Sequence, residues 1–157
     1  MVMDYPNEKN NYLTEHASLI RHSYNNWLLS ELIPKCTSEL DFAKRLFEAD
    51  FAVVTHNTAT HPIFNYANQK ALELFEFVWQ DFTQLPSKLS AEPVNQNERE
   101  RLLAEVTKNG YINHYEGIRL SRTGKRFVIK NAVVWNLIDK HQVYQGQAAC
   151  FKEWLYL

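Results

Sequence analysis

The chain has 157 residues, with 17 Lys and Arg against 18 Asp and Glu, so its formal net charge is -1. This length suits one domain that buries a hydrophobic core without disulfides or a structural metal. Balanced charge removes the general attraction that drives binding to nucleic acids or acidic membranes, so we expect neither as a partner. No apolar segment has the length of a secretory signal or a membrane span, which predicts a cytoplasmic location.

The first third of the chain is predicted to be helical. Apolar residues recur at helical spacing from Leu13 to Trp27, and Pro34 is expected to end this helix. Ser38 is suited to start a second helix, because its side chain can accept hydrogen bonds from free backbone N–H groups. We therefore expect residues 1–50 to form a helical extension that packs on the chain's own core or forms a homodimer.

The rest of the chain alternates between strands and helices. Five strand-like segments are predicted, at residues 51–55, 63–66, 111–121, 125–137 and 143–154. Three helical segments lie between the second and third strands: one that Asn68 caps, a short one over 79–85, and an amphipathic one over 97–106. This order favours an α+β fold with a five-stranded antiparallel sheet and helices on one face, over residues 51–157.

Four short segments carry a resemblance to a known family: HPIFNYAN at 61–68, LPSKLSAE at 85–92, VWNL at 134–137 and GQAA at 146–149. They resemble the MEKHLA family, a PAS-like domain found in small stand-alone bacterial and cyanobacterial proteins and at the C-terminus of plant homeodomain–leucine-zipper regulators. The resemblance implies a PAS-like fold with a sensory or regulatory role. It implies no DNA binding here, because the chain has no homeodomain or zipper, and it supplies no catalytic residues.

PAS-like folds bind ligands between the helices and the inner face of the sheet, so the resemblance implies a pocket there. Phe127, Asn131 and Trp135 lie at alternating positions of one predicted strand, so we expect them to share a face. An unpaired amide buried there would cost about 1–3 kcal/mol. Gln145 and Gln147 lie near small residues that leave room for a planar molecule. The predicted pocket walls are Tyr66, Leu72, Phe127, Asn131, Trp135 and Gln147. A flavin or another aromatic ligand is one candidate, and amides that pair within a ligand-free core are the alternative.

Two other functions remain open beside this non-enzymatic sensory module. One is a dimerisation module without a ligand, and the other is a small enzyme that uses His61 or His114 as a base. The histidines have no metal-ligand spacing, and the helix over 97–109 contains none, so neither a metal nor haem is expected.

Polar residues outside the predicted pocket are expected to have structural roles or to be solvated. Ser87 and Ser90 are expected to cap or stabilise turns, because nothing around them suggests an activated nucleophile. A basic group surrounds the hairpin between the third and fourth predicted strands. Because no aromatic stacking platform accompanies it, we expect it to be solvated; it comprises Arg119, Arg122, Lys125, Arg126 and Lys130.

Overall fold

The structure is a computed structural model, and it describes residues 4–157. Its N-terminal part contains a 3-10 helix and two α-helices: η1 (Glu8–Leu13), α1 (Thr14–Leu28) and α2 (Glu39–Glu48). The predicted first helix is confirmed, but it ends before Pro34, because Leu29 adopts a left-handed conformation with a φ of 56°. Ser38 caps α2 as predicted, and its Oγ accepts a hydrogen bond of 3.0 Å from the Asp41 N–H.

Six strands form one antiparallel sheet. They are β1 (Ala52–His56), β2 (Phe64–Ala67), β3 (Tyr111–Leu120), β4 (Arg126–Ile138), β5 (Tyr144–Phe151) and β6 (Glu153–Tyr156). The strand order is β2-β1-β5-β4-β3, and β6 pairs with β4 beyond the end of β5. The five predicted strands are therefore confirmed, and the last one is interrupted at Lys152.

Four helical segments connect β2 to β3, namely α3 (Gln69–Phe75), α4 (Trp79–Phe82), η2 (Ser87–Ser90) and α5 (Pro93–Asn109). Asn68 caps α3 as predicted, and its Oδ1 accepts hydrogen bonds from the N–H groups of Ala71 and Val53. Its Nδ2 donates to the carbonyl oxygens of Leu46 and Phe51. This fully buried amide therefore joins α2, α3 and β1.

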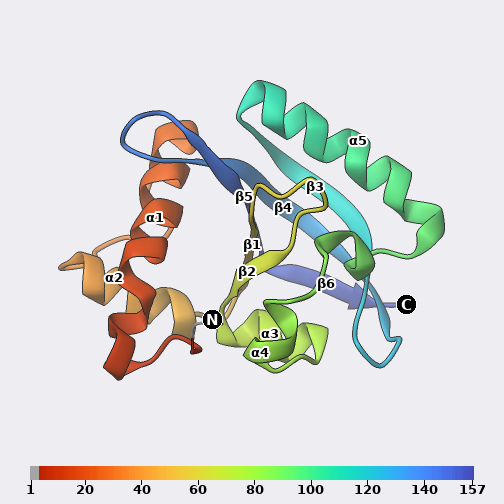
Figure 1. Cartoon of the computed structure of the whole chain (residues 1–157), viewed down its shortest axis with the longest axis horizontal. Coiled ribbons are helices and arrows are strands. Elements are labelled where there is room, and N and C mark those ends of the chain that lie inside the picture. The colour runs from red at the N-terminus through yellow and green to blue at the C-terminus, as the bar shows by residue number, and fades with distance from the viewer. Residues whose placement is uncertain (1–3) are drawn as a thin grey trace.

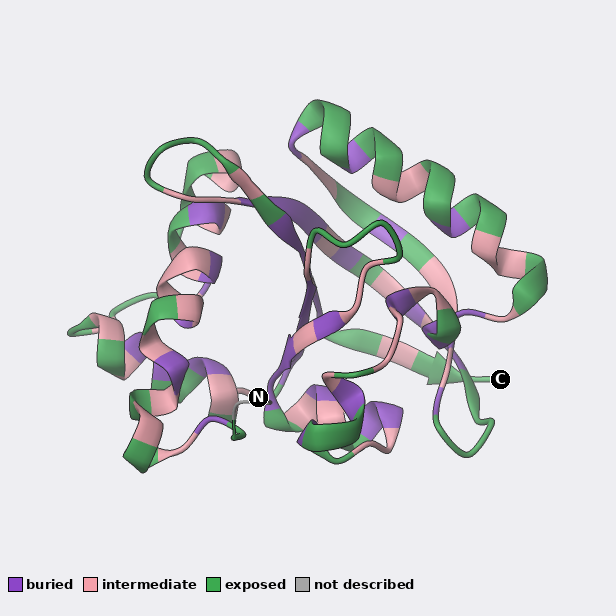
Figure 2. Cartoon of the chain, viewed as in Figure 1, coloured by how far each residue is buried: buried purple, intermediate pink, exposed green. Residues whose placement is uncertain are grey.

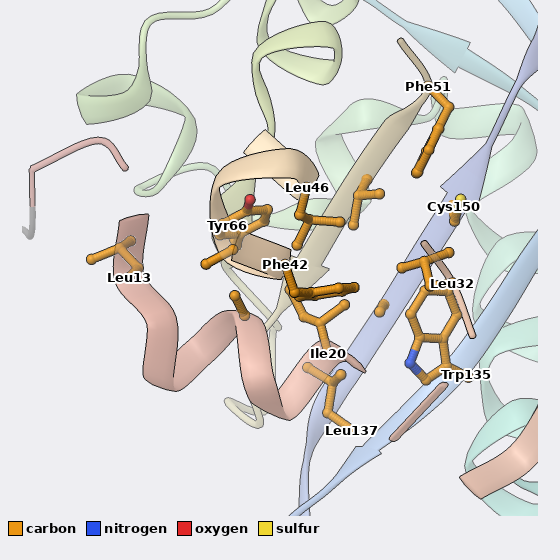
Figure 3. Close-up of a cluster of buried hydrophobic side chains, with 14 of the residues drawn as sticks. Leu13, Ile20, Leu32, Phe42, Leu46, Phe51, Tyr66, Trp135, Leu137 and Cys150 are labelled. Carbon is orange, nitrogen blue, oxygen red and sulfur yellow. The ribbon is translucent and has the colours of Figure 1, made fainter. Parts of the chain in front are cut away.

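Helices cover both faces of the sheet (Figure 1). The face covered by α1 and α2 is here called the outer face, and the face covered by α3 and α5 is the inner face. On the outer face, Ile20 and Phe42 pack in one cluster with Trp135 of β4 (Figure 3). On the inner face, Val106 of α5 packs in a second cluster with Ile129. The α+β fold is confirmed, with the N-terminal helices lying opposite the predicted helical layer.

One expectation about β4 is wrong, namely that Phe127, Asn131 and Trp135 share a face. Phe127 belongs to the inner cluster and Trp135 to the outer one, because the regular alternation is broken between them. Asn131 has a φ of 52° and lies between the segment of β4 that pairs with β6 and the segment that pairs with β5. A residue inserted in this way moves every later side chain to the opposite face.

A domain boundary at residue 50 stays a prediction. The outer cluster contains residues from both sides of it, such as Leu46 and Val53. Between residues 4 and 157, no helix is both long enough and apolar enough to cross a membrane.

Candidate ligand-binding site

A small cavity lies on the inner face, between the sheet and the helices α5 and η2. Its volume is about 50 Å³. Its wall combines apolar residues with four large polar side chains: His56, Arg99, Arg119 and Gln147. Only Gln147 belongs to the pocket that the sequence predicts. The cavity is thus where the PAS-like resemblance implies one, but mostly different residues form it.

Arg99 reaches the cavity from α5, the helix that lies over this face of the sheet (Figure 1). Its guanidinium Nη2 donates a hydrogen bond of 2.7 Å to the Ser87 Oγ in η2. Burial, together with the positive charge of Arg119, lowers the pKa of Arg99 to about 10. The side chain therefore still carries its charge at neutral pH, although the surrounding wall opposes it.

Arg119 reaches the same cavity from β3, and the expectation that it is solvated is wrong. It is only 9 % exposed, and its guanidinium lies over the ring of Tyr115, 5.5 Å from the ring centroid. Its Nη2 also donates to the Tyr115 hydroxyl at 2.8 Å. Gly117 lies between these residues, and a Cβ there would be only 2.9 Å from the Tyr115 hydroxyl. A side chain at this position would therefore disturb the packing of Arg119 on Tyr115.

His56 contributes a hydrogen-bond acceptor to the cavity wall. Its Nδ1 lies 3.0 Å from the carbonyl oxygen of Asn57, which can only accept, so Nδ1 carries the proton. The opposite nitrogen, Nε2, is buried and has no hydrogen bond of normal geometry within residues 4–157. Burial lowers the pKa of His56, although the Asn57 carbonyl and the nearby Gln147 amide act in the opposite direction. The imidazole is therefore neutral at pH 7, and its unprotonated Nε2 lacks a hydrogen bond of normal geometry in the described part of the chain.

Gly146 allows the close approach of the strand that lies beside His56. It has a φ of 122°, and a Cβ at this position would lie 2.0 Å from the His56 carbonyl oxygen. Only glycine satisfies both conditions.

Two buried amides connect the cavity wall to the last turns of α5. Gln147 Nε2 donates to the Leu103 carbonyl oxygen at 3.0 Å, to Thr107 Oγ1 at 2.9 Å and to Asn136 Oδ1 at 3.2 Å. Asn136 Nδ2 in turn donates to the carbonyl oxygens of Val106 and Thr107. These acceptors lie in the last two turns of α5, and the Val106 carbonyl also accepts from the Gly110 N–H. The sheet therefore holds this end of α5 by polar contacts as well as by the packing of Val106.

The structure does not bring the six predicted pocket residues together. Tyr66 and Trp135 belong to the outer cluster, Phe127 to the inner one, and Leu72 contacts both. Asn131 is exposed, and its Nδ2 donates a hydrogen bond of 2.5 Å to a carboxylate oxygen of Glu153. A ligand role for these six residues remains a prediction that the structure does not test.

The spacing of residues in the sequence could have identified the two arginines of the cavity. Arg99, Leu103 and Val106 are separated by four and three residues, so they share one side of α5. Arg119 follows Tyr115 and Gly117 at alternate positions of β3. In each case an arginine occupies an inward position, where an apolar residue is the norm.

The histidines that the enzyme alternative names lie away from this cavity. His61 and His114 are exposed and do not line the cavity. Residues 4–157 contain no group of three or more His, Cys, Asp or Glu side chains that could hold a metal ion. Cys150 lies in the outer cluster, and burial raises the pKa of its thiol to about 12.

A flavin does not fit the cavity as the structure shows it. Sites for cofactors and drug-sized ligands measure roughly 300–1,000 Å³, several times the volume found here. The cavity admits only a molecule of a few non-hydrogen atoms, since an apolar cavity of about 150 Å³ holds one benzene.

Solved structures with a similar fold are PAS and photoreceptor domains. The PAS domain of a protein from Colwellia psychrerythraea has a TM-score of 0.60 at 15 % identity, over 69 % of this chain and 89 % of that one. A PAS domain from a two-component sensor histidine kinase has a TM-score of 0.56 at 12 % identity, over 73 % and 91 %. The light-state dimer of the fungal blue-light photoreceptor Vivid has a TM-score of 0.59 at 15 % identity, over 86 % and 90 %. At these identities the likeness shows the fold alone.

The sequence itself identifies the family. Among curated proteins, none matches this chain. The family model of the MEKHLA domain matches residues 14–156, which include both helical layers and the whole sheet. The chain therefore belongs to the MEKHLA domain family.

Proposed function

We propose that this chain is a sensory or regulatory PAS-like module, without catalytic activity, that binds a small ligand in the inner-face cavity. The observation that carries the proposal is that buried polar side chains in the cavity wall form fewer hydrogen bonds of normal geometry, in the described part of the chain, than they can. Arg99 and His56 are buried there, yet within residues 4–157 Arg99 donates only to Ser87, and His56 Nε2 has no hydrogen bond of normal geometry. Buried polar groups are normally fully paired, so an incomplete wall favours a ligand that completes it.

The helix α5 supports a regulatory role because it is weakly attached. Figure 2 shows that most of its surface is exposed. Arg99 and Val106 are its only buried residues. Segments with few buried apolar contacts open at a lower free energy than the rest of a domain. A ligand that contacts Arg99 would therefore stabilise α5 and change the surface that a partner meets.

The alternative of a dimer through the N-terminal helices has less support. The apolar sides of α1 and α2 already pack in the outer cluster of their own chain (Figure 3). A dimer that used the same sides would have to displace them from the sheet.

The proposal can be tested with three probes of similar size: propionate, propionamide and 1-propanol. We expect at least one of them to raise the melting temperature and to slow hydrogen exchange in α5. The variant Ala149→Val adds two methyl groups to the cavity wall and should abolish this response. The control is Ala104→Val, which makes the same change at an exposed position of α5. No response to any of the three probes, or an unchanged response in Ala149→Val, would contradict the proposal.

A further inference from the structure

Two buried positive charges face one cavity without a salt-bridge partner in residues 4–157. Arg99 is 7 % exposed and Arg119 is 9 % exposed. Within residues 4–157, no carboxylate lies within 4.0 Å of either guanidinium, although eight other basic and acidic pairs do meet this limit. Arginine is almost never buried unless it is paired, because an isolated buried charge costs more free energy than the fold regains.

The hydrogen bonds of the two arginines leave most of their donors unused. Within residues 4–157, Arg99 donates only to the Ser87 hydroxyl, while Arg119 donates to the Ile118 carbonyl oxygen and the Tyr115 hydroxyl. All three acceptors are neutral, so they orient the guanidiniums without neutralising them. Two forked donors that face the same space match the two oxygens of a carboxylate.

We propose that the cavity binds a small organic carboxylate, whose charged end lies between Arg99 and Arg119. This inference rests on the proposed function and adds the charge and class of the ligand. The remaining wall is mainly apolar and includes Ile129, Val134 and Phe151, which suits a short hydrocarbon tail. An inorganic anion such as phosphate would make no contact with this apolar surface. The volume of about 50 Å³ limits the hydrocarbon tail to a few carbon atoms.

The decisive comparison is between propionate and propionamide, which have nearly the same shape but differ in charge. Calorimetric titration at constant ionic strength should show that propionate binds at least tenfold more tightly than propionamide. Phosphate at the same concentration should produce no saturable binding. Arg99→Met should reduce propionate affinity at least tenfold.

Arg101→Met is the matched control, because Arg101 is exposed on the same helix. It should leave propionate affinity unchanged. Without a ligand, Arg99→Met should unfold at the same denaturant concentration as the parent or at a higher one, because the variant loses an unpaired buried charge. A purely structural arginine would instead give a less stable variant.

The outcomes separate this inference from the proposed function. If propionamide binds as tightly as propionate, or if Arg99→Met keeps the propionate affinity, the carboxylate inference is wrong while the cavity remains a ligand site. If phosphate alone binds, the site holds an adventitious ion only, and the inference is wrong. If propionate, propionamide and 1-propanol all fail to bind, both proposals are wrong. If Arg99→Met does not fold, Arg119→Met provides the same test from β3.

Discussion

The outer and inner faces of the sheet use the same strands but are filled in different ways. On the outer face, large apolar side chains from α1 and α2 pack against the sheet, and Tyr24 packs edge-on against Trp135 with ring centroids 5.0 Å apart. On the inner face, α5 contributes an arginine where a core helix would place an apolar residue, and a cavity remains. If the proposed function is right, the inner face gives up part of its stability for binding, and the outer face does not. Active and binding sites commonly show this exchange.

The strongest test of this contrast removes the largest fully buried side chain of the outer cluster. Trp135→Ala should lower the free energy of unfolding by about 3–5 kcal/mol, since it leaves a cavity in a closed core. Urea unfolding measures the loss, and Trp135→Phe, which retains an aromatic ring, should lose less. Propionate affinity should not change while the variant is folded. A loss below about 1 kcal/mol would show that the outer face is not closely packed.

Acid should destabilise the protein because it protonates His16, a histidine of the outer helical layer. Burial lowers the pKa of His16 in α1 from 6.5 to about 4, and its Nε2 lies 2.9 Å from Thr55 Oγ1. Between these values the unfolded chain binds more protons than the folded one, so stability falls as the pH drops from 6.5 towards 4. This shift corresponds to a loss of up to about 3 kcal/mol from His16.

Urea unfolding at pH 7 and at pH 4.5 measures this loss. His16→Asn should remove most of the difference, whereas His22→Asn, at an exposed position of the same helix, should not. Part of the pH dependence should remain in His16→Asn, because burial also lowers the pKa of His56. If His16→Asn loses as much stability between pH 7 and pH 4.5 as the parent does, other groups cause the acid sensitivity.

The polar contacts that hold α5 should matter more than the exposed amide of β4. Gln147→Leu removes the donor to Leu103, Thr107 and Asn136 and should cost about 1–3 kcal/mol. Asn131→Gly should change stability by less than about 0.5 kcal/mol, because Asn131 is exposed and glycine readily adopts its φ of 52°. Chemical unfolding of both variants compares them directly, and a larger cost for Asn131→Gly would refute the structural assignment.

These two amides also show how far the sequence could predict the site. The alternation of apolar residues correctly predicted that β4 has buried faces. It cannot detect an inserted residue, so it wrongly predicted that Asn131 and Trp135 share a face. Gln147 was predicted in the pocket wall, yet its partner Asn136 was missed, because the interruption at Asn131 decides which face Asn136 occupies.

The helices and caps were predictable because their signals are local, as with Ser38 and Asn68. The arginines were not recognised, because a charged residue on an amphipathic helix or beside a hairpin is usually solvated. Only the tertiary arrangement of α5 and β3 shows that Arg99 and Arg119 meet at one cavity. Likewise, the apolar stripe of α1 could not distinguish packing on its own sheet from packing on a second chain.

A change in ligand affinity is expected from the histidine on the inner face. Nε2 of His56 accepts no hydrogen bond of normal geometry within residues 4–157, so a carboxylate that also carries a hydroxyl group should bind better than one that does not. Lactate is propionate with one added hydroxyl, and a net hydrogen bond of about 0.5–1.5 kcal/mol corresponds to roughly a two- to tenfold gain in affinity. The two enantiomers of lactate should differ, since only one can direct its hydroxyl towards His56 while its carboxylate stays on the arginines. Calorimetric titration measures both effects, and His56→Phe should remove the advantage of lactate while propionate affinity is retained. Equal binding of lactate and propionate to the parent protein would show that Nε2 does not face the ligand.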